Sequence, residues 1–271
     1  MIVHELKYSA TNTYLVDSGK GLLLFDTGWA GTFSTFCRAC GQLEIPVQQI
    51  DVILISHFHP DHYGIAGQIA QLGPKVLVMD RQRDYLHAYD EVLAKDQDFE
   101  PINEEQCIFL SCEESEDFLA GLGIDGKVIP TPGHSDDSIS LWLSDGTLFV
   151  GDLNPLYELE AHRGTQIAES WDRLLDLKPE KICYGHARTW ERDSENEAKR
   201  CNCIDDSTEG SADVALVSRI MKLTDKGMPK EKIQKKTGAD PVLIEDVIRM
   251  YLTHRNVGVA GILDRIEIKN R

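Results

Sequence analysis

Short apolar runs alternate with amphipathic stretches through the first half of the chain. Residues 12–17 alternate in hydropathy, and Gly19-Lys20-Gly21 predicts a hairpin turn into the apolar residues 22–25. Further continuous apolar runs, typical of buried strands, are residues 51–55, 76–79 and 107–110. The stretches between and after them predict helices at residues 32–43, 63–72, 82–94 and 113–122. Strands that alternate with helices predict an α/β layered fold.

The pattern continues to about residue 190. After a short apolar step at residues 128–129, two runs predict a hairpin across Asp145-Gly146. These runs are residues 139–143 and 148–150, and a loop (153–164), a helix (166–177) and a strand (181–185) follow them. Several predicted strands end in a side chain that can bind a metal, and loops at strand ends commonly form active sites in layered folds.

The polar segment 191–210 separates this region from a helical tail. The predicted units are therefore a catalytic domain at 1–205 and a C-terminal extension at 211–271. The tail predicts helices at residues 212–226, 228–236 and 240–254. Three short helices with a glycine turn are compatible with a helix-turn-helix module. We favour an appendage that packs on the catalytic domain or pairs two subunits as a homodimer.

Charge is distributed unevenly over the 271 residues. The tail from Ser211 carries 12 Lys and Arg against 8 Asp and Glu, a net of +4. The preceding part carries 16 against 37, a net of −21. Such an acidic body repels polyanions and the tail is only weakly basic, so nucleic acid is disfavoured as a partner and a small-molecule substrate is expected.

Composition favours a globular protein of the cytoplasm. The hydrophobic fraction is 42%, and the chain has neither an apolar run of membrane-spanning length nor a basic segment followed by an apolar core at residues 1–5. The seven cysteines are scattered, which favours a reducing compartment over a disulfide scaffold. Cys37 with Cys40 and Cys201 with Cys203 form two pairs that could together supply a four-thiolate zinc site. We favour two unrelated pairs, because their spacing does not match that of a zinc ribbon.

Residues 56–63 (Ser-His-Phe-His-Pro-Asp-His-Tyr) are the strongest chemical signal in the chain. Three imidazoles and a carboxylate follow a buried strand within a few residues, which packing does not explain. His57 and His59 project to the same side of a strand end and can bind one metal ion. Asp61 and His62 lie on the turn into the next helix and can face a second ion about 3.5–4 Å away.

These residues open a series of motifs that resembles the metallo-β-lactamase-fold superfamily over about residues 10–190. The motifs, in order, are Asp26-Thr27-Gly28, His57-x-His59-x-Asp61-His62, Gly133-His134, Gly151-Asp152 and Tyr184-Gly185-His186. The resemblance implies a four-layer αββα sandwich with a two-metal site. The helical tail after residue 205 lies outside the resemblance.

The resemblance also implies a role for each matching residue. His57, His59 and His134 would bind the first ion; Asp61, His62 and His186 the second; Asp152 would bridge both. Asp26 would orient the site without binding a metal, although an aspartate that only caps a turn fits as well. Tyr63 and Tyr157 are weaker candidates for substrate contacts, with core packing as the alternative, and Trp29 is a candidate pocket wall.

Two departures narrow the implied activity. Enzymes that destroy β-lactams usually have a cysteine in place of Asp152, and flavodiiron-type members replace His59 by glutamate. What remains resembles glyoxalase II, acyl-homoserine-lactone lactonases and ribonuclease Z, with the ribonuclease disfavoured by the acidic body. The expected reaction is attack of a metal-bridging hydroxide on the carbonyl of a small ester, thioester or lactone. Asp152 would direct the nucleophile, and Asp61 or a bound water would protonate the leaving group.

The ligand set of nitrogen and oxygen atoms suits two divalent ions, with Zn²⁺ first and Fe²⁺ or Mn²⁺ as alternatives. Two other functions remain open. One is a mononuclear-iron oxygenase resembling persulfide dioxygenases, which use residues of the His57, His134 and Asp152 type. The other is a non-enzymatic regulator that uses the tail to bind DNA or a protein. Specificity is expected to depend on residues 81–125 and the loop 153–164.

Overall fold

The computed structural model describes residues 1–95, 98–192, 210–253 and 258–269. Within these ranges the strands form two sheets, of six strands in the order β1-β2-β3-β4-β5-β6 and of five in the order β11-β10-β9-β8-β7. The first sheet consists of β1 (Ile2–Leu6), β2 (Thr13–Asp17), β3 (Leu22–Phe25), β4 (Val52–Leu54), β5 (Lys75–Met79) and β6 (Cys107–Leu110). The second consists of β7 (Gly126–Pro130), β8 (Ile139–Leu143), β9 (Thr147–Phe149), β10 (Lys181–Cys183) and β11 (Trp190–Glu191).

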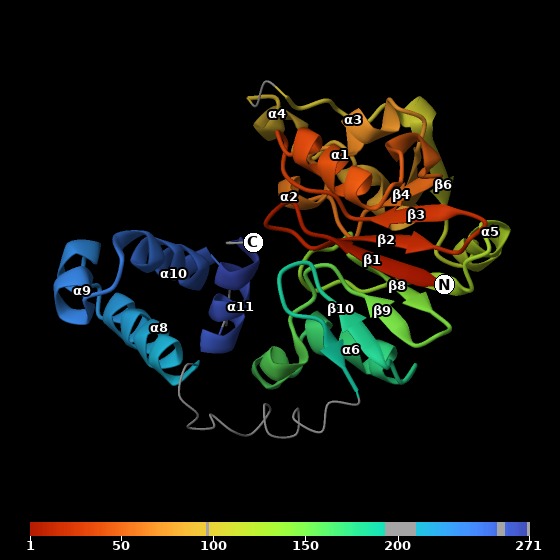
Figure 1. The fold of residues 1–271 in the computed structure, drawn as a ribbon. Helices are drawn as coiled ribbons and strands as arrows, with labels where there is room; N and C mark the ends of the chain where they lie inside the picture. Colours follow the sequence, from red (N-terminus) through yellow and green to blue (C-terminus); the bar gives the residue numbers. More distant parts are fainter. Residues whose placement is uncertain (96–97, 193–209, 254–257, 270–271) are drawn as a thin grey trace.

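Helices flank both sheets and form the C-terminal extension (Figure 1). Those of the first region are α1 (Phe33–Gln42), α2 (Pro60–Tyr63), α3 (Ala66–Ala70), α4 (Asp90–Leu93), α5 (Ser115–Gly121) and α6 (Gln166–Leu175). Segments of 3-10 helix are η1 (Val47–Gln49), η2 (Asp80–Tyr85), η3 (Glu104–Gln106) and η4 (Leu156–His162). The extension contains α8 (Gly210–Asp225), α9 (Lys230–Thr237), α10 (Pro241–Thr253) and α11 (Val259–Lys269).

The predicted αββα sandwich is confirmed: two sheets pack face to face between helices, and central strands such as β2, β4 and β9 are buried on both faces. In β4, Ile53 packs towards α1 and α3, whereas Val52 and Leu54 pack towards the second sheet. The layer on the far side of the second sheet is α6, whose fully buried Trp171 packs with Ile182 of β10. Strands covered on both sides need apolar residues at successive positions, which explains the continuous apolar runs.

The two sheets also determine where the chemistry lies. Strand β4 is parallel to β3 and β5, and β9 is parallel to β10, so the carboxyl ends of these strands share one edge in each sheet. A hydrogen bond from the Ile139 amide to the Ser56 carbonyl (2.8 Å) joins the end of β4 to β8 of the other sheet. The motif-bearing loops of both sheets therefore meet at one end of the sandwich.

Two predicted helices of the first region differ from the structure. The helix expected at 63–72 is shorter in the structure: α3 covers only Ala66–Ala70, and Tyr63 ends α2. Between them, Gly64 lies so close to the backbone of Gly28 and Ala30 that a Cβ would not fit. The helix expected at 82–94 is wrong: the structure has η2 and the one-turn α4 there. The buried Gln82 side chain accepts from the Met79 amide (3.1 Å), three residues earlier, and donates to the Ile55 carbonyl (2.8 Å). The second contact is tertiary, and local propensity does not include it.

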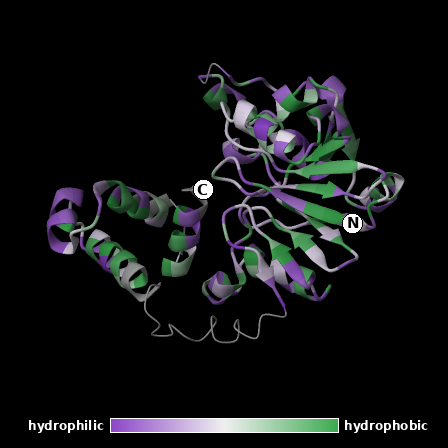
Figure 2. Cartoon of the chain, viewed as in Figure 1, coloured by the Kyte–Doolittle hydropathy of each residue, from purple (hydrophilic) through white to green (hydrophobic). Residues whose placement is uncertain are grey.

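The C-terminal extension has a separate apolar core, in which Val217, Ile220, Ile233, Val247 and Ile262 are buried. Helix α11 lies nearest to the catalytic region, and α9 at the far end is largely hydrophilic (Figures 1 and 2). The structure describes four helices here rather than the three predicted. The helix-turn-helix and homodimer hypotheses stay predictions.

Polar contacts join α11 to the body. Asp264 accepts a hydrogen bond from the Tyr157 hydroxyl (2.9 Å) and pairs with Arg188 (3.3 Å), which also pairs with Glu267. The amide of Gly258 donates to Glu158 (3.3 Å). Over the described parts of the chain, every helix is too short or too polar to cross a bilayer.

Candidate metal centre

Seven side chains with metal-binding atoms converge at the shared end of the two sheets. His57 and His59 follow β4, Asp61 and His62 occupy the first turn of α2, and His134 lies between β7 and β8. Asp152 follows β9 and His186 follows β10. All seven predicted ligands are thus brought together, in three overlapping groups whose donor atoms lie within 4.8 Å of one another.

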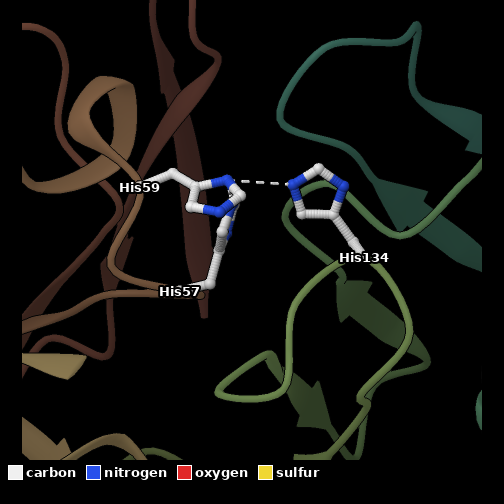
Figure 3. A group of neighbouring side chains, drawn as sticks. All are labelled: His57, His59 and His134. Atoms are coloured by element: carbon white, nitrogen blue, oxygen red, sulfur yellow. Dashed lines mark hydrogen bonds between the residues drawn. The ribbon is translucent and has the colours of Figure 1, made fainter. Parts of the chain in front are cut away.

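The first group consists of three histidines from both halves of the sandwich (Figure 3). His59 Nδ1 lies 3.0 Å from His57 Nε2 and 3.1 Å from His134 Nε2. Three ring nitrogens at these separations face a common point. Imidazole nitrogens bind Zn²⁺ at about 2.0–2.1 Å, so this arrangement is of the right size for one ion.

The second group adds carboxylates. Asp61 Oδ2 lies 2.9 Å from His186 Nε2 and 3.9 Å from His62 Nε2. Asp152 lies between the two groups: Oδ1 is 3.2 Å from His62 Nε2 and Oδ2 is 3.6 Å from His134 Nε2. Each oxygen of one carboxylate therefore faces a different group of histidines.

The electrostatics of the two groups differ. Burial lowers the pKa of His57 well below its ordinary value and that of His134 to about 4, so both rings are neutral at neutral pH and have a lone pair to donate. For His62 burial also lowers the pKa, but the surrounding Asp152, Asp26 and Asp61 outweigh burial and raise it.

The carboxylates show the reverse balance. Burial raises the pKa of Asp152, yet His186 and His62 bring it well below its usual range. Burial likewise raises the pKa of Asp61, and His62 and His186 bring it to about 2. Both carboxylates are therefore ionised at neutral pH.

Asp26 orients the rings of His62 and His57 through their Nδ1 atoms, on the side away from the cluster. Its Oδ1 accepts from the Ser56 amide (2.6 Å), and its Oδ2 lies 2.8 Å from the Ser56 hydroxyl and 2.9 Å from His62 Nδ1. Ser56 Oγ in turn lies 3.0 Å from His57 Nδ1. Nδ1–H of both histidines is donated to these groups, so Nε2 of each faces the centre and is the nitrogen that a metal would bind.

The backbone of Asp26 is itself unusual, with φ at +59° in the left-handed region. Non-glycine residues adopt this conformation at a cost of roughly 1–2 kcal/mol, and aspartate and asparagine are the side chains that tolerate it best. The side chain is fully buried, and the three contacts above stabilise it.

Supporting residues that the sequence interpretation missed include Ser56 and Asp137. The Asp137 carboxylate accepts from the Phe58 amide (2.7 Å), between His57 and His59, and so ties the first histidine motif to the loop of His134. Ser56 immediately precedes the histidines, and Asp137 lies three residues after His134. The position of these two polar residues beside the ligand motifs is the sequence signal that could have identified them.

The weaker candidates lie elsewhere. Tyr63 is fully buried against Phe58, and its hydroxyl donates to Asp90 (3.1 Å), which fits the packing alternative. Tyr157 is 42% exposed and bonded to Asp264 of α11; Trp29 is 47% exposed. The ring of Tyr89, from the region 81–125, meets His59 edge-on at 5.6 Å. A wall of the site formed by this region stays a prediction.

The hypothesis of a zinc site at the cysteine pairs has little support. Cys201 and Cys203 lie outside the described residues. Cys40 is a buried residue of α1, and burial raises the pKa of its thiol to about 12. Among the described residues, the groups of potential ligands include no cysteine.

Two buried atoms indicate that a cation fits the cluster. His62 Nε2 and Asp152 Oδ1 have no hydrogen-bond partner among the described residues, although they lie 3.2 Å apart. With Nδ1–H of His62 donated to Asp26, these two atoms face each other at the centre of the group. A metal ion satisfies both, and the donor set of imidazole and carboxylate suits Zn²⁺, Fe²⁺ or Mn²⁺.

Comparison with known proteins agrees with this geometry. The family model of the metallo-beta-lactamase superfamily matches residues 7–186. The chain belongs to that superfamily. The matched region contains all seven converging side chains and ends at His186, whereas the helical extension lies beyond it.

Individual relatives are more distant. The chain is 29% identical to a beta-lactamase-like protein 2 homolog of Drosophila melanogaster over 67% of its own length and 60% of that protein. It is 27% identical to thioesterase pkgB of Emericella nidulans over 55% of its length and 37% of that protein. The chain thus spans three fifths or less of these relatives.

A solved structure of a metallo-beta-lactamase family protein from Thermus thermophilus is 19% identical to this chain, with a TM-score of 0.56. The alignment covers 98% of this chain and 92% of that one. At this identity the likeness establishes the fold alone.

Proposed function

We propose that the protein is a dinuclear metal-dependent hydrolase that acts on a small ester, thioester or lactone. The observation that carries the proposal is the position of Asp152, whose two oxygens face different groups of histidines. Membership of a superfamily that includes hydrolases supports the reaction class. The relative named as a thioesterase supports an acyl substrate.

In this proposal His57, His59 and His134 hold one ion, and Asp61, His62 and His186 hold the other, with Asp152 between them. Two divalent ions, most simply zinc, would lower the pKa of a shared water and polarise a substrate carbonyl. Asp26 and Ser56 hold the histidine tautomers that leave Nε2 free. The charge of Asp152 fixes the direction of the nucleophile.

The low pKa of Asp61 bears on how the leaving group obtains a proton. A carboxyl with a pKa of about 2 is ionised at neutral pH and is a poor proton donor. We therefore propose Asp61 as a ligand and as a hydrogen-bond acceptor for water, and water as the source of the proton.

The test is metal content on freshly purified full-length protein, together with hydrolysis of a panel of thioesters and lactones. We expect about two ions per chain in the wild type and a sharp fall in both metal content and hydrolysis in Asp152→Asn. Asp176→Asn is the matched control, because Asp176 is exposed at the end of α6. It should keep wild-type metal content and rates.

Other outcomes would replace the proposal. One tightly held iron per chain, with oxygen uptake on glutathione persulfide, would establish the mononuclear oxygenase instead. A folded protein that rejects added zinc and binds a partner only through residues 211–271 would establish the non-enzymatic regulator.

A further inference from the structure

The segment between β1 and β2 contacts both chain regions that carry the ligands Asp61 and His186. We call Ala10, Thr11 and Asn12 the strap. Thr11 is 1% exposed and Asn12 is 5% exposed, so their polar groups are removed from water. Buried polar side chains need hydrogen-bond partners, and the partners of these two lie in the candidate metal centre.

Asn12 holds the backbone on both sides of His186. Its side-chain Nδ2 donates to the carbonyls of Tyr184 (2.9 Å) and Ala187 (3.1 Å), and its main-chain amide donates to the carbonyl of Gly185 (2.8 Å). Three hydrogen bonds from one residue therefore fix the turn from which the His186 ring projects. This contact joins the first sheet to the second.

The strap also determines which nitrogen of His186 is available. The Ala10 carbonyl lies 2.9 Å from His186 Nδ1 and can only accept, so Nδ1 carries a hydrogen and Nε2 is the nitrogen left for a metal ion. It is Nε2 that lies 2.9 Å from Asp61 Oδ2. A hydrogen bond behind a histidine ligand orients the ring and raises its basicity.

Thr11 makes the corresponding contact to the other ligand. Its hydroxyl donates to the main-chain carbonyl of Asp61 (2.8 Å), at the first turn of α2. The Ser9 hydroxyl accepts from the Thr11 amide (3.2 Å) and shapes the strap locally. Two of the three ligands in the second group are thus held by three consecutive residues.

The first group depends on different residues. Asp137 accepts from the amide between His57 and His59, and Ser56 lies against the His57 ring. Ser56 and Asp26 also contact His62 of the second group. The hydrogen bonds of the strap itself reach the regions of Asp61 and His186, so a change in the strap should act unequally on the two ions.

We propose that the strap is a positioning element that sets the metal affinity of the second position, formed by Asp61, His62 and His186, separately from the first. This inference rests on the proposed dinuclear site. Neither Thr11 nor Asn12 touches the reacting atoms in it; both act through Asp61 and His186.

The test is zinc titration of the metal-free full-length protein in competition with a chromophoric chelator, which resolves two binding steps. His186→Ala and His134→Ala first identify which step belongs to which position. Thr11→Val removes the hydroxyl with little change of shape, and should weaken only the step lost in His186→Ala, by about 10-fold. Asn12→Ala should weaken the same step by up to about 100-fold.

Thr13→Val is the matched control. Thr13 is equally buried and lies two residues along the same chain, but its hydroxyl donates to the Leu6 carbonyl (3.3 Å) rather than to a ligand region. It should leave both steps unchanged. Thr11→Ser, which keeps the hydroxyl, should restore the affinity that Thr11→Val loses. Thermal unfolding of each metal-free variant shows that it is folded.

Three results would overturn the proposal. Wild-type affinity at both steps in Thr11→Val and Asn12→Ala would show that the strap does not act on the metal. Equal weakening of both steps would show a general structural role. A wild-type protein that binds a single ion would refute the dinuclear site itself, and the role of the strap with it, which distinguishes that failure from the other two.

Discussion

Replacing Asp26 by asparagine tests whether a buried carboxylate sets the tautomers of the metal-binding histidines. The substitution keeps the shape of the side chain, and asparagine tolerates the left-handed backbone at this position, where φ is +59°. The Ser56 amide always donates, so the amide oxygen of the new residue must take the place of Oδ1. The NH₂ group then faces His62 Nδ1 and the Ser56 hydroxyl.

Two donors cannot face each other, so His62 Nδ1 must give up its hydrogen, and the ring carries a hydrogen on Nε2 alone. That hydrogen points at Asp152 Oδ1, 3.2 Å away, in the place where a metal would bind. Through Ser56 Oγ the same reversal reaches His57 Nδ1. Without metal the new tautomers are well satisfied, so the free energy of unfolding should change by no more than about 1 kcal/mol.

In Asp26→Asn, metal binding must remove the hydrogen from Nε2 of His62. His62 loses its charge-assisted hydrogen bond to Asp26, which is worth about 1.5–3 kcal/mol. A value of about 2 kcal/mol corresponds to roughly 30-fold weaker zinc binding at the position that contains His62, since 1.4 kcal/mol is a factor of ten. Hydrolysis at limiting zinc should fall by the same factor.

The assay is zinc competition against a chelator, combined with urea unfolding of the metal-free protein. Asp51→Asn is the control: its Oδ2 accepts from the Leu22 amide (2.8 Å) at the opposite end of β4, and zinc affinity should be unaffected. Wild-type zinc affinity in Asp26→Asn would refute the reasoning, as would a loss of affinity explained entirely by unfolding.

Three further predictions concern steric room, buried thiols and pH. In Gly185→Ala the added Cβ would lie 2.7 Å from Asp152 Oδ1, so zinc content and hydrolysis should fall at least about 10-fold; Gly121→Ala, whose Cβ meets nothing within 4 Å, should be silent in both assays. Because burial raises the pKa of Cys40 to about 12, mass spectrometry should find it unlabelled by iodoacetamide at about pH 8 until the protein is unfolded, and rapid native labelling would contradict its packing. Burial lowers the pKa of His134 from 6.5 to about 4, so the unfolded chain binds a proton at this residue more readily than the folded chain does. The free energy of unfolding of the metal-free protein should therefore fall as the pH falls from about 6.5 to 4. Urea unfolding of His134→Asn should show a shallower fall, and an unchanged slope would refute the assignment.

The sequence by itself determined the layers of the fold and the identity of the clustered side chains. Apolar runs such as residues 51–55 predicted buried strands correctly, because a strand covered on both faces admits few polar residues. The spacing of His57, His59, Asp61 and His62 required no tertiary information, since four such side chains at a strand end lie close together in any fold. More distant motifs, such as the one at His186, could be added only through the family resemblance.

Tertiary structure alone decided the local exceptions and the supports of the site. The helix expected at 82–94 failed where the Gln82 side chain donates to the Ile55 carbonyl after β4, a tertiary contact that no local pattern encodes. Asn12 and His186 are 174 positions apart in the chain, and their neighbourhood exists only once both sheets have packed. Hydrogen bonds that fix a tautomer depend on distances of about 3 Å between such remote groups, so the sequence identifies the ligands while the fold determines how they are held.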